Sequence, residues 1–199
     1  MYSRVVLRAL GLGLLVTLVV LALSACGGGG SGGVQGSEDA GDGEQGMAGN
    51  KHIAGVKDID VGPTGIHILG DVDYDQTPPA GGQHHDVWQN CGFYDEPVRD
   101  ENAVHSLEHG AVWITYQRDL PQEQIEKLSD LAQSNRFVLV SPYPDLPAPV
   151  VASAWGKQLS VQSAEDPDLK RFVRFYSQGP QVHVEPGHSS CRGGKGNPQ

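Results

Sequence analysis

The pattern of apolar and polar residues divides this chain into three parts. Residues 9–23 are almost all apolar, whereas residues 27–50 contain eleven glycines and no aromatic or basic side chain. From residue 51 onward, short apolar runs alternate with polar segments, as is typical of a folded domain. A glycine-rich, acidic segment buries too little apolar surface to fold. The pattern therefore predicts an apolar leader, a disordered tether and one globular domain of about 150 residues.

Four runs in the domain have the β-branched and aromatic composition of strands. They are short, so they predict a small sheet. The runs lie at 111–117, 136–143, 150–155 and 157–161. Two weaker candidates lie upstream, at 66–69 and 72–74, in a region that is otherwise rich in loop-forming residues.

Three segments combine apolar residues at helical spacing with helix start or stop signals. They run from about 100 to 110, from 121 to 135 and from 166 to 179. Proline fits the first turn of a helix, and glycine fits the position after its end. Together with the strands, these helices predict a mixed α/β (α+β) fold, in a single compact domain with a small sheet and about three helices.

The N-terminal leader has the features of a bacterial lipoprotein signal. Arg4 and Arg8 precede the apolar stretch, and a Leu-Ser-Ala-Cys sequence ends it at Cys26. This ending resembles a lipobox, which implies cleavage before Cys26 and lipidation of that residue. An uncleaved signal anchor is the alternative, because the stretch approaches membrane-spanning length. Both readings place the domain outside the cytoplasm, and Gly27 favours the outer membrane or the cell surface of the envelope.

The expected organisation follows from these segments. The signal peptide spans 1–25, the lipidated cysteine and tether 26–50, the globular domain 51–190 and a flexible tail 191–199. The chain has 14 basic and 24 acidic residues and a net charge of −10. A protein this acidic is repelled by nucleic acid and by anionic headgroups. We therefore expect membrane contact through the N-terminal lipid, no nucleic-acid partner, and an envelope protein partner that the sequence does not identify.

Two of the three cysteines, Cys91 and Cys191, remain once Cys26 is assigned to the lipid. They lie in a compartment that permits disulfides. A bridge between them would attach the glycine-rich tail to the domain. Two free thiols, or two thiolates acting as soft metal ligands, are the alternatives.

Residues 105–110, His-Ser-Leu-Glu-His-Gly, contain the first candidate site. His105 and His109 are four residues apart, so on a helix they share one face. This spacing can give two imidazoles to one metal ion. Glu108 is a candidate ligand, a partner that orients an imidazole, or a base. In the structural alternative, histidines in the last turn interact with the helix dipole and cap carbonyl groups.

A second histidine group, His84 and His85, follows a loop at 78–82 that is rich in proline and glycine. Such a loop can present a ligand at a fixed point, and the alternative is a surface loop with solvated histidines. Adjacent residues of an extended chain point in opposite directions. We therefore expect that His84 and His85 do not both face one site.

Several motifs occur in the order found in one bacterial family. After the Pro-Pro loop that leads to His84 come Gly-Phe-Tyr-Asp-Glu-Pro at 92–97, His-Ser-Leu-Glu-His-Gly at 105–110, Pro-Ala-Pro at 147–149 and Ala-Trp-Gly at 154–156. Over residues 74–179 the chain resembles the bacterial domain of unknown function 3105. The resemblance implies a secreted or membrane-anchored protein and no particular reaction. The loop departs from the family pattern, with Ala80, Gly81 and Gln83 in place of Thr, Ser and Pro, and His85 in place of an aromatic residue.

The first hypothesis for function is a metal-binding lipoprotein. Imidazole suits copper and zinc, and the general affinity order favours copper. The expected ligands are His84, His105, His109 and Glu108, with His85 as an additional candidate and Cys91, His183, His188 or Cys191 as further donors.

Two other hypotheses remain. Residues 105–109 fit the His-x-x-Glu-His arrangement of a zinc-dependent hydrolase, in which the glutamate acts as base. The predicted helix stops at Gly110, however, and is shorter than such an enzyme needs, so the sequence favours a binding protein and no catalytic residue is assigned. The third hypothesis is a structural or partner-binding envelope module, whose histidines bond to buried carboxylates and backbone. These hypotheses differ in whether His84 reaches the face formed by His105 and His109.

Overall fold

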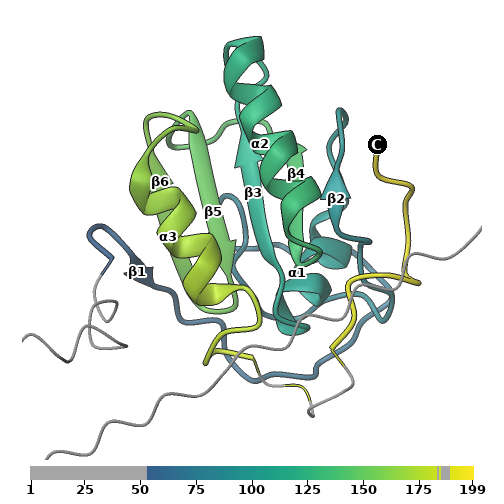
Figure 1. Cartoon of the computed structure of the whole chain (residues 1–199). Helices are drawn as coiled ribbons and strands as arrows, with labels where there is room; N and C mark the ends of the chain where they lie inside the picture. The colour runs from purple at the N-terminus through teal and green to yellow at the C-terminus, as the bar shows by residue number, and fades with distance from the viewer. Residues whose placement is uncertain (1–52, 183, 185–188) are drawn as a thin grey trace, which may run out of the picture. The chain divides into compact units, whose positions relative to one another are not determined.

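The computed structural model describes residues 53–182, 184 and 189–199 (Figure 1). The expected signal peptide, the lipidation at Cys26 and the tether lie outside the described residues, as do His183 and His188. Within the described part of the chain, no helix is long and apolar enough to cross a membrane.

The sheet has six strands in the order β1-β6-β5-β3-β4-β2. β4 pairs in parallel with β3 and with β2, and the other pairs are antiparallel. The strands are β1 Lys57–Asp58, β2 Gly92–Phe93, β3 Val112–Tyr116, β4 Val138–Pro142, β5 Val150–Ala154 and β6 Lys157–Val161. A mixed sheet with three helices confirms the predicted mixed α/β fold class.

The helices are α1 Asp100–Glu108, α2 Gln122–Ser134 and α3 Pro167–Tyr176. α2 forms the crossover that connects the parallel strands β3 and β4, because parallel neighbours cannot be joined by a tight turn. At the start of α3, the Asp166 side chain accepts a hydrogen bond from the Asp168 N–H at 2.9 Å. This cap, with proline in the first turn, is the start signal that the sequence contains.

The two faces of the sheet pack against different helices. In β3, Val112 and Ile114 pack with residues of α2 and α3, whereas Trp113 packs with residues of α1. Successive side chains of a strand point to opposite faces, which produces this division. Figure 1 shows α2 and α3 next to each other over one face of the central strands. The candidate site lies on the other side, with α1.

The segment before β2 differs from the sequence prediction. Neither 66–69 nor 72–74 forms a strand, and the only bridge in these ranges pairs His67 with His84. β1 and β2 have two residues each, too few for an alternating pattern to predict. We call residues 59–91 the loop layer, because they contain none of the helices and strands named above.

The end of the chain also differs from the prediction of a flexible tail at 191–199. The Asn90 N–H donates to the Lys195 carbonyl, and the Lys195 N–H donates to the Trp88 carbonyl, each at 2.8 Å. Gly194 allows this approach, because a side chain there would collide with Trp88. Backbone pairing therefore holds the tail against the loop layer.

Candidate metal centre

Helix α1 is unusual because its polar side chains are buried and bond to the loop layer. Every residue from Glu101 to Glu108 is buried. Five of their side chains bond to the backbone of the loop layer, each at a different residue. Glu101 accepts from the Val72 N–H, Asn102 donates to the Val87 carbonyl, His105 Nδ1 donates to the His85 carbonyl, Ser106 donates to the Gln89 carbonyl, and Glu108 accepts from the Gly65 N–H. These bonds replace the strand pairing that the loop layer lacks, since buried backbone groups require partners.

Backbone pairing places His67 beside His84. The Ile68 N–H donates to the His84 carbonyl at 2.8 Å, and the His84 N–H donates to the Ile66 carbonyl at 3.1 Å. The centroids of the two imidazole rings are 4.8 Å apart. Two segments of the loop layer therefore bring one histidine each to the face of α1.

Four side chains form a cluster there. His67, His84, His105 and Glu108 each offer one ligand atom, and these atoms all lie within 4.8 Å of one another. His84, His105 and Glu108 are buried, and His67 is exposed. Three imidazoles and a carboxylate form a donor set that suits zinc or copper.

Backbone carbonyls determine which nitrogen of each imidazole carries hydrogen. The Nδ1 atoms of His84, His105 and His109 lie 2.7, 2.7 and 2.9 Å from the carbonyl oxygens of Gly82, His85 and Ser190. A carbonyl only accepts, so each Nδ1 is the donor, and in a neutral ring Nε2 then presents a lone pair. In histidines that bind metals, such a hydrogen bond from the nitrogen that does not bind the ion typically orients the ring.

Two pairs of acceptor atoms face each other as a result. Nε2 of His105 lies 3.1 Å from Nε2 of His109, and Nε2 of His84 lies 3.1 Å from Oε2 of Glu108. The His84 Nε2 is fully buried and has no hydrogen bond of acceptable geometry in the described structure. Each close pair requires either an additional proton on an imidazole or a cation between the two atoms.

Burial and charge set the protonation of the cluster. Burial lowers the pKa of His105 to about 4, with contributions from the neighbouring histidines, so its ring is neutral at pH 7. Burial alone would raise the pKa of Glu108, but its contacts with His84 and the Gly65 N–H lower it to about 2. The site therefore offers a neutral imidazole at His105 and an ionised carboxylate at Glu108.

Two tryptophans pack against the imidazoles. The Trp155 ring lies 5.7 Å from that of His84, and the Trp88 ring lies 4.8 Å from that of His109, measured between centroids. Trp155 is itself buried. Apolar walls exclude water and strengthen the interaction between a cation and its ligands.

The other predicted residues are placed as follows. His109 lies outside the four-residue cluster, with its Nε2 against His105. His85 points elsewhere: its Nδ1 accepts from the Val87 N–H at 3.1 Å and lies 2.8 Å from an Asp86 oxygen. The expectation of His85 as an additional ligand does not fit this placement, because neighbouring residues of extended chain face opposite ways.

The cysteines are joined in a disulfide between Cys91 and Cys191, whose Cα atoms are 5.2 Å apart. Both sulfur atoms are therefore used in the bridge, and neither is a thiolate ligand as the alternative reading proposed. The bridge lies next to the site through Ser190, whose carbonyl accepts from His109 Nδ1.

His67 was not among the residues predicted for the site. It is a lone histidine within a weak strand candidate, and no ligand spacing connects it to the other histidines. The sequence did show the weak strand candidate at 66–69, but it did not specify that this segment pairs with the chain around His84.

Both carboxylate oxygens of Glu108 lie against other groups of the protein in this structure. α1 ends at Glu108, and His109 is already its C-terminal cap. One carboxylate oxygen of Glu108 accepts from the Gly65 N–H at 2.7 Å, and the other faces His84. A general base needs an oxygen that can reach a substrate water, and here both oxygens are engaged.

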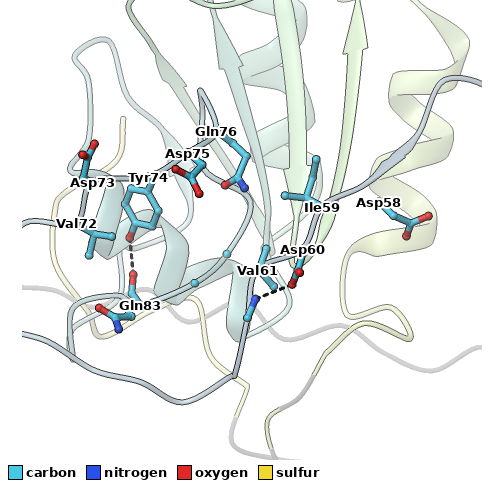
Figure 2. A pocket seen from close by; sticks show the side chains of 13 residues that line it. Asp58, Ile59, Asp60, Val61, Val72, Asp73, Tyr74, Asp75, Gln76 and Gln83 are labelled. Carbon is cyan, nitrogen blue, oxygen red and sulfur yellow. Dashed lines mark hydrogen bonds between the residues drawn. The ribbon is translucent and has the colours of Figure 1, made fainter.

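A separate open cavity of about 620 Å³ is lined in part by Gly81, Gly82 and Gln83, which precede His84 in the chain (Figure 2). Its lining includes Asp58, Asp60, Asp73 and Asp75 and no basic side chain. The Tyr74 hydroxyl donates to the Gln83 carbonyl at 2.7 Å across this cavity. The lining of this cavity contains none of the four clustered side chains, so the cavity and the cluster are separate sites.

The fold and the cluster together define an α/β domain with a buried histidine and glutamate site. A family model described as protein of unknown function (DUF3105) matches residues 67–193. The chain belongs to this family, which confirms the resemblance noted from its motifs. Neither the comparison with curated proteins nor the comparison with solved structures gives a match.

Proposed function

We propose that this protein binds one transition-metal ion, copper or zinc, through His67, His84, His105 and Glu108, with His109 as a fifth donor. The observation that carries the proposal is the convergence of acceptor atoms. Three imidazoles have Nδ1 bound to carbonyls, and their Nε2 atoms lie against one another or against Glu108. A cation between these atoms removes the repulsion and satisfies the buried Nε2 of His84.

The distances agree with this proposal. Metal–nitrogen bonds of about 2.0–2.1 Å at a tetrahedral angle separate two ligand atoms by about 3.3 Å. The pairs His105–His109 and His84–Glu108 are each 3.1 Å apart. An ion therefore needs only small side-chain movements to bind at either pair. To bind all four atoms of the cluster, which lie within 4.8 Å of one another, the ion must draw the other donors inward.

The donor set restricts the ion. Neutral imidazoles with one carboxylate suit zinc and Cu(II), and the general order of affinity favours copper where both are present. A soft site for Cu(I) usually contains thiolate or thioether sulfur. The sulfur atoms of Cys91 and Cys191 are joined in the disulfide, so neither supplies such a ligand.

The test is metal content and affinity of the full chain, kept in mild detergent because of its apolar leader or, after processing, its N-terminal lipid. The protein is stripped with chelator, loaded with copper or zinc, and analysed by plasma mass spectrometry and calorimetry. We expect one equivalent of metal in the wild type and none in His84→Ala or His105→Ala. His85→Ala is the matched control, because it removes a nearby imidazole outside the cluster and keeps the carbonyl that binds His105. Absence of bound metal after loading with both ions would refute the proposal.

The bonds between α1 and the loop layer favour a second candidate, a structural module without metal. In that case the imidazoles keep their bonds to the Gly82, His85 and Ser190 carbonyls, and the cluster packs without an ion. The same loading experiment distinguishes the two, since a structural module gains no stability from copper or zinc.

We also propose that the domain is lipid-anchored at Cys26 outside the cytoplasm, at the outer membrane or the cell surface, where an unidentified envelope protein is its partner. The leader sequence supports this location, and the disulfide is consistent with an oxidising compartment. Mass spectrometry of the mature N-terminus tests the anchor. A start at Met1 without lipid would refute it.

A further inference from the structure

We infer that the position of His67 is the exchangeable coordination position of the metal centre, where an external imidazole-type nitrogen donor can bind the ion. This inference rests on the proposed metal site. It names the class of external molecule that the site would bind. It also distinguishes His67, which is open to solvent, from the buried protein ligands.

Solvent exposure distinguishes His67 from its neighbours. The exposed fractions of His84, His105 and Glu108 are 0, 4 and 6%. His67 is exposed, as is Leu69, whose exposed fraction is 82%. An incoming molecule therefore reaches the cluster from the side of His67, and the three buried ligands close the opposite side.

The hydrogen bonds of the cluster give the same distinction. Nδ1 of His84 and Nδ1 of His105 each bind a carbonyl at 2.7 Å, and Glu108 accepts from a backbone N–H at 2.7 Å. Among the described residues, the His67 ring has no such bond and contacts the His84 and His105 rings, with centroids 4.8 and 4.9 Å away. Ligands held by a second bond keep their orientation, whereas His67 can rotate away from the ion.

The backbone at His67 is held independently of its side chain. The two hydrogen bonds that join this segment to His84 use the Ile68 N–H and the Ile66 carbonyl. Removal of the imidazole therefore leaves the segment in place and opens one position on the ion. The vacant space has the shape of an imidazole and is accessible from solvent.

The chemical class of the external ligand follows from the residue whose place it takes, the exposed imidazole of His67. The ligand is a neutral nitrogen donor of imidazole size, either a small molecule or a histidine of another polypeptide. The buried ligands remain bound, so exchange at this position replaces one nitrogen by another.

The experiment is chemical rescue of His67→Gly in the full chain, loaded with Cu(II) and kept in detergent. Electron paramagnetic resonance and visible absorption report the coordination of the ion. We expect the variant to have an altered spectrum and weaker binding, and imidazole to restore the wild-type spectrum. His84→Gly and His105→Gly are the matched controls, and imidazole should restore neither. An acetylated tripeptide with a central histidine shows whether a polypeptide can also supply the donor.

The outcomes are distinct. If the wild type binds no copper or zinc, the proposed function and this inference both fail. If His67→Gly binds copper with the wild-type spectrum, or if imidazole does not restore it, the exchange position is refuted while the metal site remains. If imidazole restored the wild-type spectrum of His84→Gly or His105→Gly, the exchange position would also be refuted. Circular dichroism and a second variant, His67→Ala, identify any loss of folding.

Discussion

Nε2 of His105 lies 3.1 Å from Nε2 of His109, although Nδ1 of each ring is bound to a backbone carbonyl. In two neutral rings, both Nε2 atoms would present lone pairs to each other. The His85 carbonyl of the loop layer fixes the His105 ring, and the Ser190 carbonyl of the tail fixes the His109 ring. This pair is therefore the place where a cation has the most direct effect on stability.

The first prediction concerns that effect. A metal ion that binds only the folded chain at one hundred times its dissociation constant should stabilise it by about 2.7 kcal/mol. Thermal or denaturant unfolding with and without zinc measures this difference. We expect the shift to persist in His85→Ala and to disappear in a His105→Ala/His109→Ala double variant. A full shift in the double variant would exclude this pair from the site.

The second prediction concerns pH in the metal-free chain. The pKa of His105 is about 4 in the folded state, against an ordinary value of 6.5, so the unfolded chain binds more protons between these values. The free energy of unfolding should therefore rise as pH increases from about 4 to 6.5 and become independent of His105 above that range.

Denaturant unfolding at pH 4.5 and 7 tests this second prediction. The lowered pKa of Glu108 acts in a separate window, between 4.5 and about 2, where its stabilising charge is lost as pH falls. His105→Asn is the control, because it keeps a donor for the His85 carbonyl and removes the titrating ring. An unchanged pH dependence in this variant would contradict the assignment to His105.

The third prediction separates the two roles of Glu108. Glu108→Gln retains an oxygen for the Gly65 N–H and adds an amide donor for His84, so metal-free stability should change by less than about 1 kcal/mol. Metal affinity should fall, because the charged ligand is lost. Glu108→Ala leaves buried groups without partners and should cost about 2–3 kcal/mol.

Glu96→Ala is the control for this third prediction. Glu96 forms an exposed ion pair with Arg118, and the loss of such a pair costs less than about 1 kcal/mol. If Glu108→Ala were as mild as Glu96→Ala, the buried contacts of Glu108 would not stabilise the fold.

The fourth prediction concerns the end of α1. Gly110 has φ of +89°, and a Cβ there would meet the Gln178 side chain and lie 2.7 Å from a Val182 methyl carbon. Gly110→Ala should therefore destabilise the chain by more than the roughly 1 kcal/mol expected from backbone strain alone. Gly193→Ala measures that strain, because Gly193 has φ of +84° and nothing within 4 Å of its Cβ position. Equal losses in a denaturant titration would contradict the collision.

The fifth prediction concerns the disulfide. Cys91 and Cys191 are separated by 100 residues, and closing a loop of this length stabilises a chain by up to about 4.7 kcal/mol in the entropy model. A Cys91→Ser/Cys191→Ser variant should lose about 2–5 kcal/mol. It should also bind metal more weakly, because the Ser190 carbonyl that orients His109 is no longer fixed. Wild type treated with a dithiol reductant should behave like the variant, and undiminished stability in both would contradict the prediction.

The regular elements were predictable because their signals are local. The β-branched and aromatic composition of 111–117 gives β3, and the proline and apolar spacing after residue 121 give α2. The loop layer was not predictable, because its backbone bonds to side chains of α1 that lie far away in the sequence. The weak strand at 66–69 failed for this reason, and its one bridge residue, His67, is the member of the cluster that the sequence did not indicate.

The His-x-x-Glu-His spacing correctly brought attention to α1, but it did not distinguish His109 from His105. That distinction depends on the tail, since Ser190 holds His109 toward the disulfide. A helical spacing places two side chains on one face, whereas their distance from a third residue depends on the rest of the fold.

The hydrogen bonds between α1 and the loop layer require particular side chains on the helix but not at the bonded positions of the loop layer. The helix contributes specific side chains, whereas Gly65, Val72, His85, Val87 and Gln89 contribute only backbone N–H or carbonyl groups. Any residue supplies a carbonyl at position 85, which explains why histidine can stand there in place of the aromatic residue of the family pattern. Substitutions should therefore be tolerated at Val72, His85, Val87 and Gln89 while their partners on α1 stay fixed. His67 and His84 differ from these loop positions, because their side chains belong to the cluster.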